Sequence, residues 1–200
     1  MICLWRAKIA AAVLALSVAS PAFAQAPKPD AGPPPPAPKA AAPAQNKDPL
    51  GTDVTLKGKT IIYMKGTGNW DNALEILQDA FKSVYAYLDK QGIKRAGPPM
   101  TIYTATDDTG FEFQAGVPVA EAPKGALPEG LAVGKSPEGR ALKFMHRGSY
   151  DAMDATYEAI TNYLDEKQLE AKDLFVEQYM KDPITTPEDD LVIEVYVPLK

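Results

Sequence analysis

Tyr87-Leu88-Asp89 recurs as Tyr163-Leu164-Asp165, and Val117-Pro118-Val119 recurs as Val197-Pro198-Leu199. Between these anchors the order of patterns also repeats, as an apolar strand, a turn, an amphipathic helix and two further strands. Two copies are too few for a solenoid, so the repeat predicts one domain with pseudo-two-fold symmetry. Two similar halves that face each other leave a groove between them, and such grooves are where small molecules bind.

The first 24 residues have the pattern of a signal peptide. Arg6 and Lys8 precede a short apolar run, residues 9–19, and Ala22-Phe23-Ala24 is a small-x-small cleavage site. The apolar run is too short for a bilayer, which needs about 20 residues. The sequence predicts a periplasmic or secreted protein, cleaved after Ala24 and without a membrane span once mature. The alternative is an uncleaved membrane anchor.

Residues 25–49 form a Pro/Ala-rich linker that includes Pro33-Pro34-Pro35-Pro36. This segment lacks large apolar side chains, so we expect it to be disordered, extended and solvated. It would act either as a spacer from a membrane or wall, or as a passive tether. Residues 50–200 then make one domain of ordinary length, which is long enough to bury a hydrophobic core.

The charge and the scarce residue types exclude several functions. The chain has 26 acidic and 21 basic residues and a net charge of −5, which argues against binding to nucleic acid. The single cysteine, Cys3, lies in the predicted signal peptide, so the mature protein has no thiol for disulfides, catalysis or metal. The single histidine, His146, lacks a second ligand. We therefore expect no metal and no cofactor. The sequence does not identify a protein partner.

Each half is predicted to fold as strand–helix–strand–strand, so the expected class is α+β with antiparallel sheets. The two expected helices carry apolar stripes that run from Leu74 to Leu88 and from Met153 to Leu164. The expected strands are 60–64, 100–106, 111–119, 131–133, 141–146, 174–180 and 191–199.

Alternation along the strands assigns side chains to the two faces of the sheet. In 191–199 every odd position is apolar and would lie under a helix, which leaves Glu194 and Tyr196 on the other face. In the strand before it, the same argument places Leu174 and Val176 under the helix. The face without helices is then expected to collect rings and carboxylates, namely Tyr103, Glu112, Phe175, Glu177, Tyr179, Glu194 and Tyr196.

Rings and carboxylates together suit flat or cationic compounds, because ring stacking and cation–π contacts contribute about 0.5–2 kcal/mol each. Trp70, at the start of the first helix, would be a lid over such a site or a residue that packs the helix start. The alternative for the whole face is an exposed antiparallel sheet with ordinary cross-strand pairs.

Three motifs in the second half resemble the GyrI-like small-molecule-binding domain. This is the effector-binding domain of AraC-type and MerR-type multidrug-responsive regulators, and it is related to the SOUL haem-binding fold. The motifs are an H-x-G-x-Y step that ends at Tyr150, an E-x-Y-x-x-D-P strand end from Glu177 to Pro183, and the terminal strand Ile193-Glu194-Val195-Tyr196-Val197-Pro198-Leu199. Their order and spacing match over about residues 55–200.

The resemblance implies a ligand groove between two strand–helix–strand–strand modules. In regulators of this kind an acidic residue in an aromatic groove binds lipophilic cations, and the residue that matches this acid is Glu177. Some stand-alone members are similar to hydrolases that open cyclopropane-containing natural products, again with a groove glutamate. Only the signal and linker patterns precede the domain, with no helix-turn-helix, so a DNA-binding role is not carried over.

The sequence thus predicts an exported stand-alone protein that binds an amphipathic ligand, with a cation as the favoured kind. The first alternative is a hydrolase of reactive cyclopropane-type molecules with Glu177 as acid and base, and the second is haem or tetrapyrrole binding. For the binding protein no catalytic residue is expected. The expected ligand contacts are Glu177, Tyr179, Phe175, Tyr103, Glu112, Glu194, Tyr196 and Trp70.

Overall fold

A computed structural model of the chain describes residues 51–200. The predicted signal peptide and the Pro/Ala-rich linker lie outside this range. Within residues 51–200, neither helix is long and apolar enough to cross a membrane.

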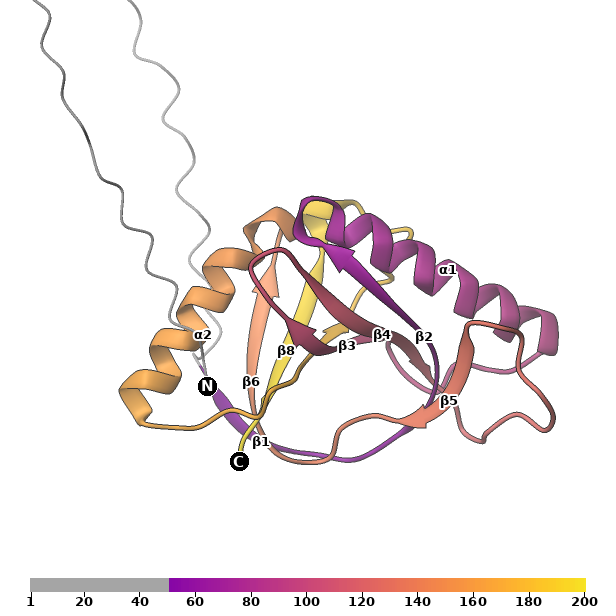
Figure 1. Cartoon of the computed structure of the whole chain (residues 1–200), viewed down its shortest axis with the longest axis horizontal. Helices are drawn as coiled ribbons and strands as arrows, with labels where there is room; N and C mark the ends of the chain where they lie inside the picture. The colour runs from indigo at the N-terminus through magenta and orange to yellow at the C-terminus, as the bar shows by residue number, and fades with distance from the viewer. Residues whose placement is uncertain (1–50) are drawn as a thin grey trace, which may run out of the picture. The chain divides into compact units, whose positions relative to one another are not determined.

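The described part of the chain is α+β, with eight strands and two α-helices (Figure 1). The helices are α1 (Ala73–Gln91) and α2 (Met153–Lys167), and each follows a short 3-10 turn, η1 (Trp70–Asn72) or η2 (Tyr150–Ala152). A third such turn is η3 (Glu188–Asp190). The strands are β1 (Thr52–Leu56), β2 (Thr60–Asn69), β3 (Met100–Thr106), β4 (Gly110–Pro118), β5 (Leu131–Lys135), β6 (Gly139–Arg147), β7 (Phe175–Tyr179) and β8 (Val192–Pro198).

All eight strands join in one antiparallel sheet of order β1-β6-β8-β7-β3-β4-β2-β5. The two halves, β2-α1-β3-β4 and β6-α2-β7-β8, have the expected order of elements and meet where β3 pairs with β7. The expected fold class is therefore confirmed. The halves share one continuous sheet, and β1, which the sequence did not predict, extends it at one edge.

Both helices end in the same way. In α1 the amide of Gly92, at φ 65°, donates to the carbonyls of Leu88 and Asp89. In α2 the amide of Gln168, at φ 53°, donates to the carbonyls of Leu164 and Asp165. The left-handed residue satisfies carbonyls that the helix itself cannot. The recurring Tyr-Leu-Asp triplets thus occupy the same place before each helix end.

Both helices pack on the same face of the sheet, which we call the helix face. The main core there joins Leu77, Phe81 and Val84 of α1 and Met153 and Ile160 of α2 to the strands. A smaller cluster on the opposite, reverse face holds four side chains buried to 4% exposure or less: Ile61, Met100, Ile102 and Val176. Both faces of the central strands therefore carry buried apolar side chains.

The predicted face assignment is correct for β4 and β8 and wrong for β3 and β7, because Tyr103 of β3 also lies in the helix-face core. Leu174 and Val176 belong to the reverse-face cluster, whereas Phe175 and Tyr179 belong to the helix-face core. The reason is that β7 is buried on both faces, so alternation separates its side chains into two sets without showing which set a helix covers. Glu177 therefore lies on the helix face, not on the face away from the helices.

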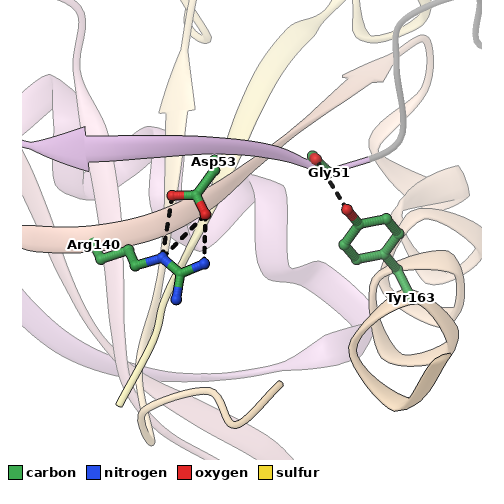
Figure 2. A network of polar contacts seen from close by, with 4 residues as sticks. All are labelled: Gly51, Asp53, Arg140 and Tyr163. Carbon is green, nitrogen blue, oxygen red and sulfur yellow. Dashed lines mark hydrogen bonds and ion pairs between the residues drawn. The ribbon is translucent and has the colours of Figure 1, made fainter. Parts of the chain in front are cut away.

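The first described residues are held against the second half of the domain (Figure 2). The hydroxyl of Tyr163 on α2 donates to the carbonyl of Gly51 at 3.2 Å, and the Arg140 guanidinium binds both carboxylate oxygens of Asp53. The ion pair is exposed and contributes little. The Gly51 contact is more specific, because a side chain there would meet the Tyr163 ring.

Candidate ligand-binding site

Glu177 on β7 is 1% exposed and accepts hydrogen bonds from four tyrosine hydroxyls. Tyr157 donates to Oε1 at 2.6 Å. Tyr179, Tyr150 and Tyr103 donate to Oε2 at 2.8, 3.0 and 3.2 Å. The hydroxyls of Tyr103 and Tyr150 also lie 2.7 Å apart. We call these four residues the tyrosine cage.

The fold brings the cage together from four elements. Tyr103 comes from β3, whose Thr101 pairs with Glu177, so alternation places Tyr103 and Glu177 on the same face. Tyr179 is two residues beyond Glu177 on β7 and therefore also shares its face. The 3-10 turn η2 supplies Tyr150, and α2 supplies Tyr157 from its inner side. The carboxylate thus lies between the sheet and α2.

Burial is the main influence on Glu177 and raises the pKa of its carboxyl group above the ordinary value, although the four tyrosine hydrogen bonds act in the opposite direction. The tyrosine pKa values are raised too, first by burial and then by the nearby Glu177 charge. Glu177 forms no ion pair with any residue in the range 51–200. The acid is therefore satisfied by neutral donors alone.

Aromatic rings surround the cage. The Phe175 ring stacks on Tyr103 with centroids 4.5 Å apart, and Tyr157 meets Phe175 edge-on at 5.0 Å. Trp70 lies 4.7 Å from Phe111 and 6.3 Å from Tyr103, and its Nε1 donates to the carbonyl of Asp107 at 2.9 Å. Trp70 is 41% exposed, so it forms the outer edge of this aromatic cluster.

The structure groups five of the eight predicted contact residues and separates the other three. Glu177, Tyr179, Phe175 and Tyr103 lie together, with Trp70 beside Tyr103. Glu112, Glu194 and Tyr196 are directed to the reverse face, where Glu194 binds Lys143 and Tyr196 at 3.1 and 2.5 Å. The sheet lies between the two groups, so they cannot share one groove. Ligand contact by any of the eight stays a prediction.

The sequence argument missed Tyr150 and Tyr157. Tyr150 is the last residue of the H-x-G-x-Y motif, which carried the family resemblance without a role for the tyrosine itself. For Tyr157 the sequence predicts only a place in the apolar stripe of α2, with no role at a site. A hydroxyl within an apolar stripe needs a hydrogen-bond partner once buried, and that requirement was the available signal.

His146 joins β6 to α2 instead of belonging to the cage. Its Nδ1 lies 2.8 Å from the Thr156 hydroxyl and its Nε2 lies 3.0 Å from the Ser149 carbonyl. A haem iron could use this imidazole only if one of those two contacts broke. Between residues 51 and 200 no group of three or more His, Cys, Asp or Glu side chains is arranged to hold a metal ion.

Solved structures with the same fold include a protein–DNA complex, a protein–ligand complex and a hydrolase, all at low identity. The EcmrR–DNA complex matches with a TM-score of 0.64 and 11% identity, over 75% of this chain and 57% of that chain. SAV2435 bound to tetraphenylphosphonium matches at 0.53 and 16%, over 75% and 93%. A hydrolase from Listeria innocua matches at 0.51 and 12%, over 75% and 91%. These likenesses show the fold.

A sequence comparison with curated proteins gives no match. The sequence profile of the GyrI-like small molecule binding domain, in contrast, matches residues 54–200, which include every strand from β2 onward, both helices and the whole tyrosine cage. The chain therefore belongs to the GyrI-like family of small-molecule-binding domains.

Proposed function

We propose that the domain binds an amphipathic organic cation, for which Glu177 supplies the negative charge and the tyrosine cage supplies ring faces. One observation carries this proposal. Glu177 is a carboxylate at 1% exposure that has four phenol donors and no cationic partner among residues 51–200.

The energetics of a buried charge favour a cation as the ligand. A carboxylate loses several kcal/mol of hydration on burial, and neutral hydrogen bonds offset only part of this cost. A cation without strongly bound water would complete the compensation, and the surrounding rings would add cation–π contacts. Anions would be rejected by the same charge. SAV2435, which has the same fold, was solved with the lipophilic cation tetraphenylphosphonium, and that precedent supports the choice of ligand class.

Ligand access requires the cage to open, because Glu177, Tyr103 and Tyr179 are each 1% exposed. Tyr157 and Phe175 are half-buried and Trp70 is 41% exposed, so these three rings are the outermost groups of the cluster. In the proposal they move aside as the ligand enters. The measured affinity then includes the cost of breaking the Tyr157–Glu177 bond.

The binding test compares ligands of similar shape and different charge. Isothermal titration would measure tetraphenylphosphonium against neutral triphenylphosphine oxide, with the wild type, Glu177→Gln and Glu112→Gln. The last variant removes an exposed carboxylate on the other side of the sheet. We expect Glu177→Gln to weaken cation binding by roughly 10-fold or more with little effect on the neutral compound, and Glu112→Gln to change neither.

Two results would contradict the proposal. Equal weakening of both compounds in Glu177→Gln would show that the variant changes the shape of the site and not its charge. Cation binding that is absent, or unchanged in Glu177→Gln, would leave Glu177 and its tyrosines as a polar element of the core.

Export completes the proposal and rests on the signal-peptide pattern of residues 1–24. Cell fractionation followed by N-terminal sequencing would test it. We expect the protein in the periplasm or medium with Gln25 as its first residue. An intact N-terminus in the cytoplasmic fraction would refute export without affecting ligand binding.

A second candidate is hydrolysis of a reactive small molecule. The raised pKa of Glu177 and its contact with four hydroxyls suit a group that passes protons to and from a substrate, and a fold neighbour is described as a hydrolase. Glu177 would take a proton from the attacking water and return it to the opened ring, so that the net change is addition of water. Product formation that disappears in Glu177→Gln would favour this candidate over binding alone.

A further inference from the structure

A hollow of about 240 Å³ lies on the reverse face of the sheet. Its floor is Met100 of β3 and Val176 of β7, which are 3% and 4% exposed, and Val54 and Leu56 of β1 add apolar surface at one side. We call it the reverse-face hollow. The cage occupies the other side of the same two strands, since Met100 pairs with Gln178 and the adjacent Thr101 pairs with Glu177.

Two connections that cross the sheet form the roof. One joins β1 to β2 through residues 57–59, the other joins β5 to β6 through residues 136–138, and both run along the lower side of the domain (Figure 1). Lys59 N donates to the Ser136 hydroxyl at 2.9 Å, and Ser136 N donates to the Lys59 carbonyl at 2.9 Å. These reciprocal bonds join the two connections of the roof to each other.

The rim of the hollow is basic although the whole chain is acidic. Lys57, Lys59 and Lys143 line it. Lys143 is paired with Glu194 at 3.1 Å. Lys57 and Lys59 are exposed and form no ion pair within residues 51–200. Two lysines that form no ion pair in the described part of the chain therefore line the hollow beside its apolar floor.

The acids nearest the hollow cancel only part of this charge. Glu194 already accepts bonds from Lys143, Tyr196 and Gln178, so donors surround its oxygens. Glu138 is exposed on the roof beside Gly58 and forms no ion pair within residues 51–200. An anion with an apolar body fits these surroundings better than a cation or a neutral compound.

We propose that the reverse-face hollow binds a small organic carboxylate with an apolar body, such as a medium-chain alkanoate or an aryl acid. The apolar body lies on Met100 and Val176, and the carboxylate lies between Lys57 and Lys59 at the rim. The two faces of the sheet then select opposite charges, with cations at the tyrosine cage and anions here. This site is independent of the proposed function of the cage.

The test follows two methionine methyl groups by NMR in the protein labelled with [¹³C-methyl]methionine. Met100 lies on the floor of the hollow, whereas Met153 lies in the helix-face core. Octanoate is the probe, with octanol and octylammonium as matched compounds. We expect octanoate to shift the Met100 signal saturably without moving Met153, and the other two compounds to bind more weakly.

Variants assign the binding to the rim. Lys57→Gln/Lys59→Gln should weaken octanoate binding by about 3- to 10-fold, the range expected for two exposed ion pairs. Lys90→Gln/Lys94→Gln removes the same charge from exposed positions at the end of α1 and beyond it, and should change binding less than 2-fold. Glu177→Gln should leave octanoate binding unchanged, which separates this result from that of the cage.

The proposal is overturned if octanoate produces no saturable shift of Met100, or if octanol binds as tightly. It is also overturned if both double variants lose the same affinity, because the effect is then the net charge of the protein. A loss of octanoate binding in Glu177→Gln would place the ligand in the cage instead.

Discussion

The hydroxyl of Tyr157 on α2 lies 2.6 Å from Oε1 of Glu177 on β7 and joins the helix to the sheet at a buried acid. Within residues 51–200 it is the one donor to that oxygen, since the other three tyrosines bind Oε2. Movement of α2 and the protonation of Glu177 are therefore linked. Whatever displaces Tyr157 also changes the energy of the carboxylate.

Tyr157→Phe should lower the free energy of unfolding by roughly 1–3 kcal/mol, because it leaves a buried carboxylate oxygen without its donor. It should also raise the pKa of Glu177 further, since this hydrogen bond lowers it. Urea unfolding and carboxyl ¹³C NMR titration measure the two effects. Tyr87→Phe on α1, whose half-buried ring lies outside the cage, is the control and should change stability by less than about 0.5 kcal/mol. Equal effects of the two variants would show that the Tyr157 bond does not form.

The stability difference between the wild type and Glu177→Gln should decrease as pH rises. Burial raises the pKa of Glu177 above its ordinary value of 4.5, so the folded protein holds a proton that the unfolded chain releases. That contribution is complete below pH 4.5 and is lost as pH rises through the folded pKa. Urea unfolding from about pH 4 to about pH 8 measures it. A difference that stays constant, or increases, would contradict the raised pKa.

Trp70 should report ligand binding at the cage. It is the one tryptophan in residues 25–200, and its ring lies 6.3 Å from Tyr103. Tetraphenylphosphonium should change its emission saturably. Trp70→Ala should weaken binding, measured by calorimetry, by roughly 2- to 5-fold through loss of a cation–π surface, whereas Trp70→Phe retains a ring and should weaken it less. Identical affinities in all three proteins would place Trp70 outside the site.

Gly51→Ala should destabilise the protein more than Gly92→Ala. Both glycines have positive φ, 69° and 65°, so both variants bear a similar backbone strain. At Gly92 an added Cβ meets nothing within 4 Å, whereas at Gly51 it lies 2.5 Å from Cζ of Tyr163. We expect an additional loss of about 1–3 kcal/mol from this overlap, measured by urea unfolding. Tyr163→Ala in the Gly51→Ala background should remove the additional loss, and failure to do so would contradict the contact in Figure 2.

Local pattern predicted most of the secondary structure because short-range physics decides it. The expected strand at 100–106 coincides with β3, and the expected apolar stripe from Leu74 to Leu88 lies within α1. The sequence did not predict β1, because Thr52–Leu56 is a half-exposed edge strand with little alternation of apolar and polar residues. Its pairing with β6, far along the chain, stabilises it instead.

The sequence correctly predicted aromatic neighbours for Glu177 but placed them on the wrong face of the sheet. An acid with aromatic neighbours was expected around Glu177, and Tyr103, Phe175 and Tyr179 are indeed there. Glu194 and Tyr196 lie on the other face, because Val195, the residue between them on β8, is the one that pairs with Glu177. The alternation of side chains along a strand follows from the local sequence. Which of the two sets faces the helices depends on how distant strands pair.

The amino-acid sequence by itself determined the strand–helix–strand–strand order, the apolar stripes of the two helices and the motifs of the family, because these depend on residues near one another in the chain. Only the tertiary structure decided that β3 pairs with β7 and that α2 brings Tyr157 to Glu177. It also decided that two crossing connections cover Val176 on the reverse face. The physical reason is that β7 is buried on both faces, so long-range packing alone selects the face that the helices cover.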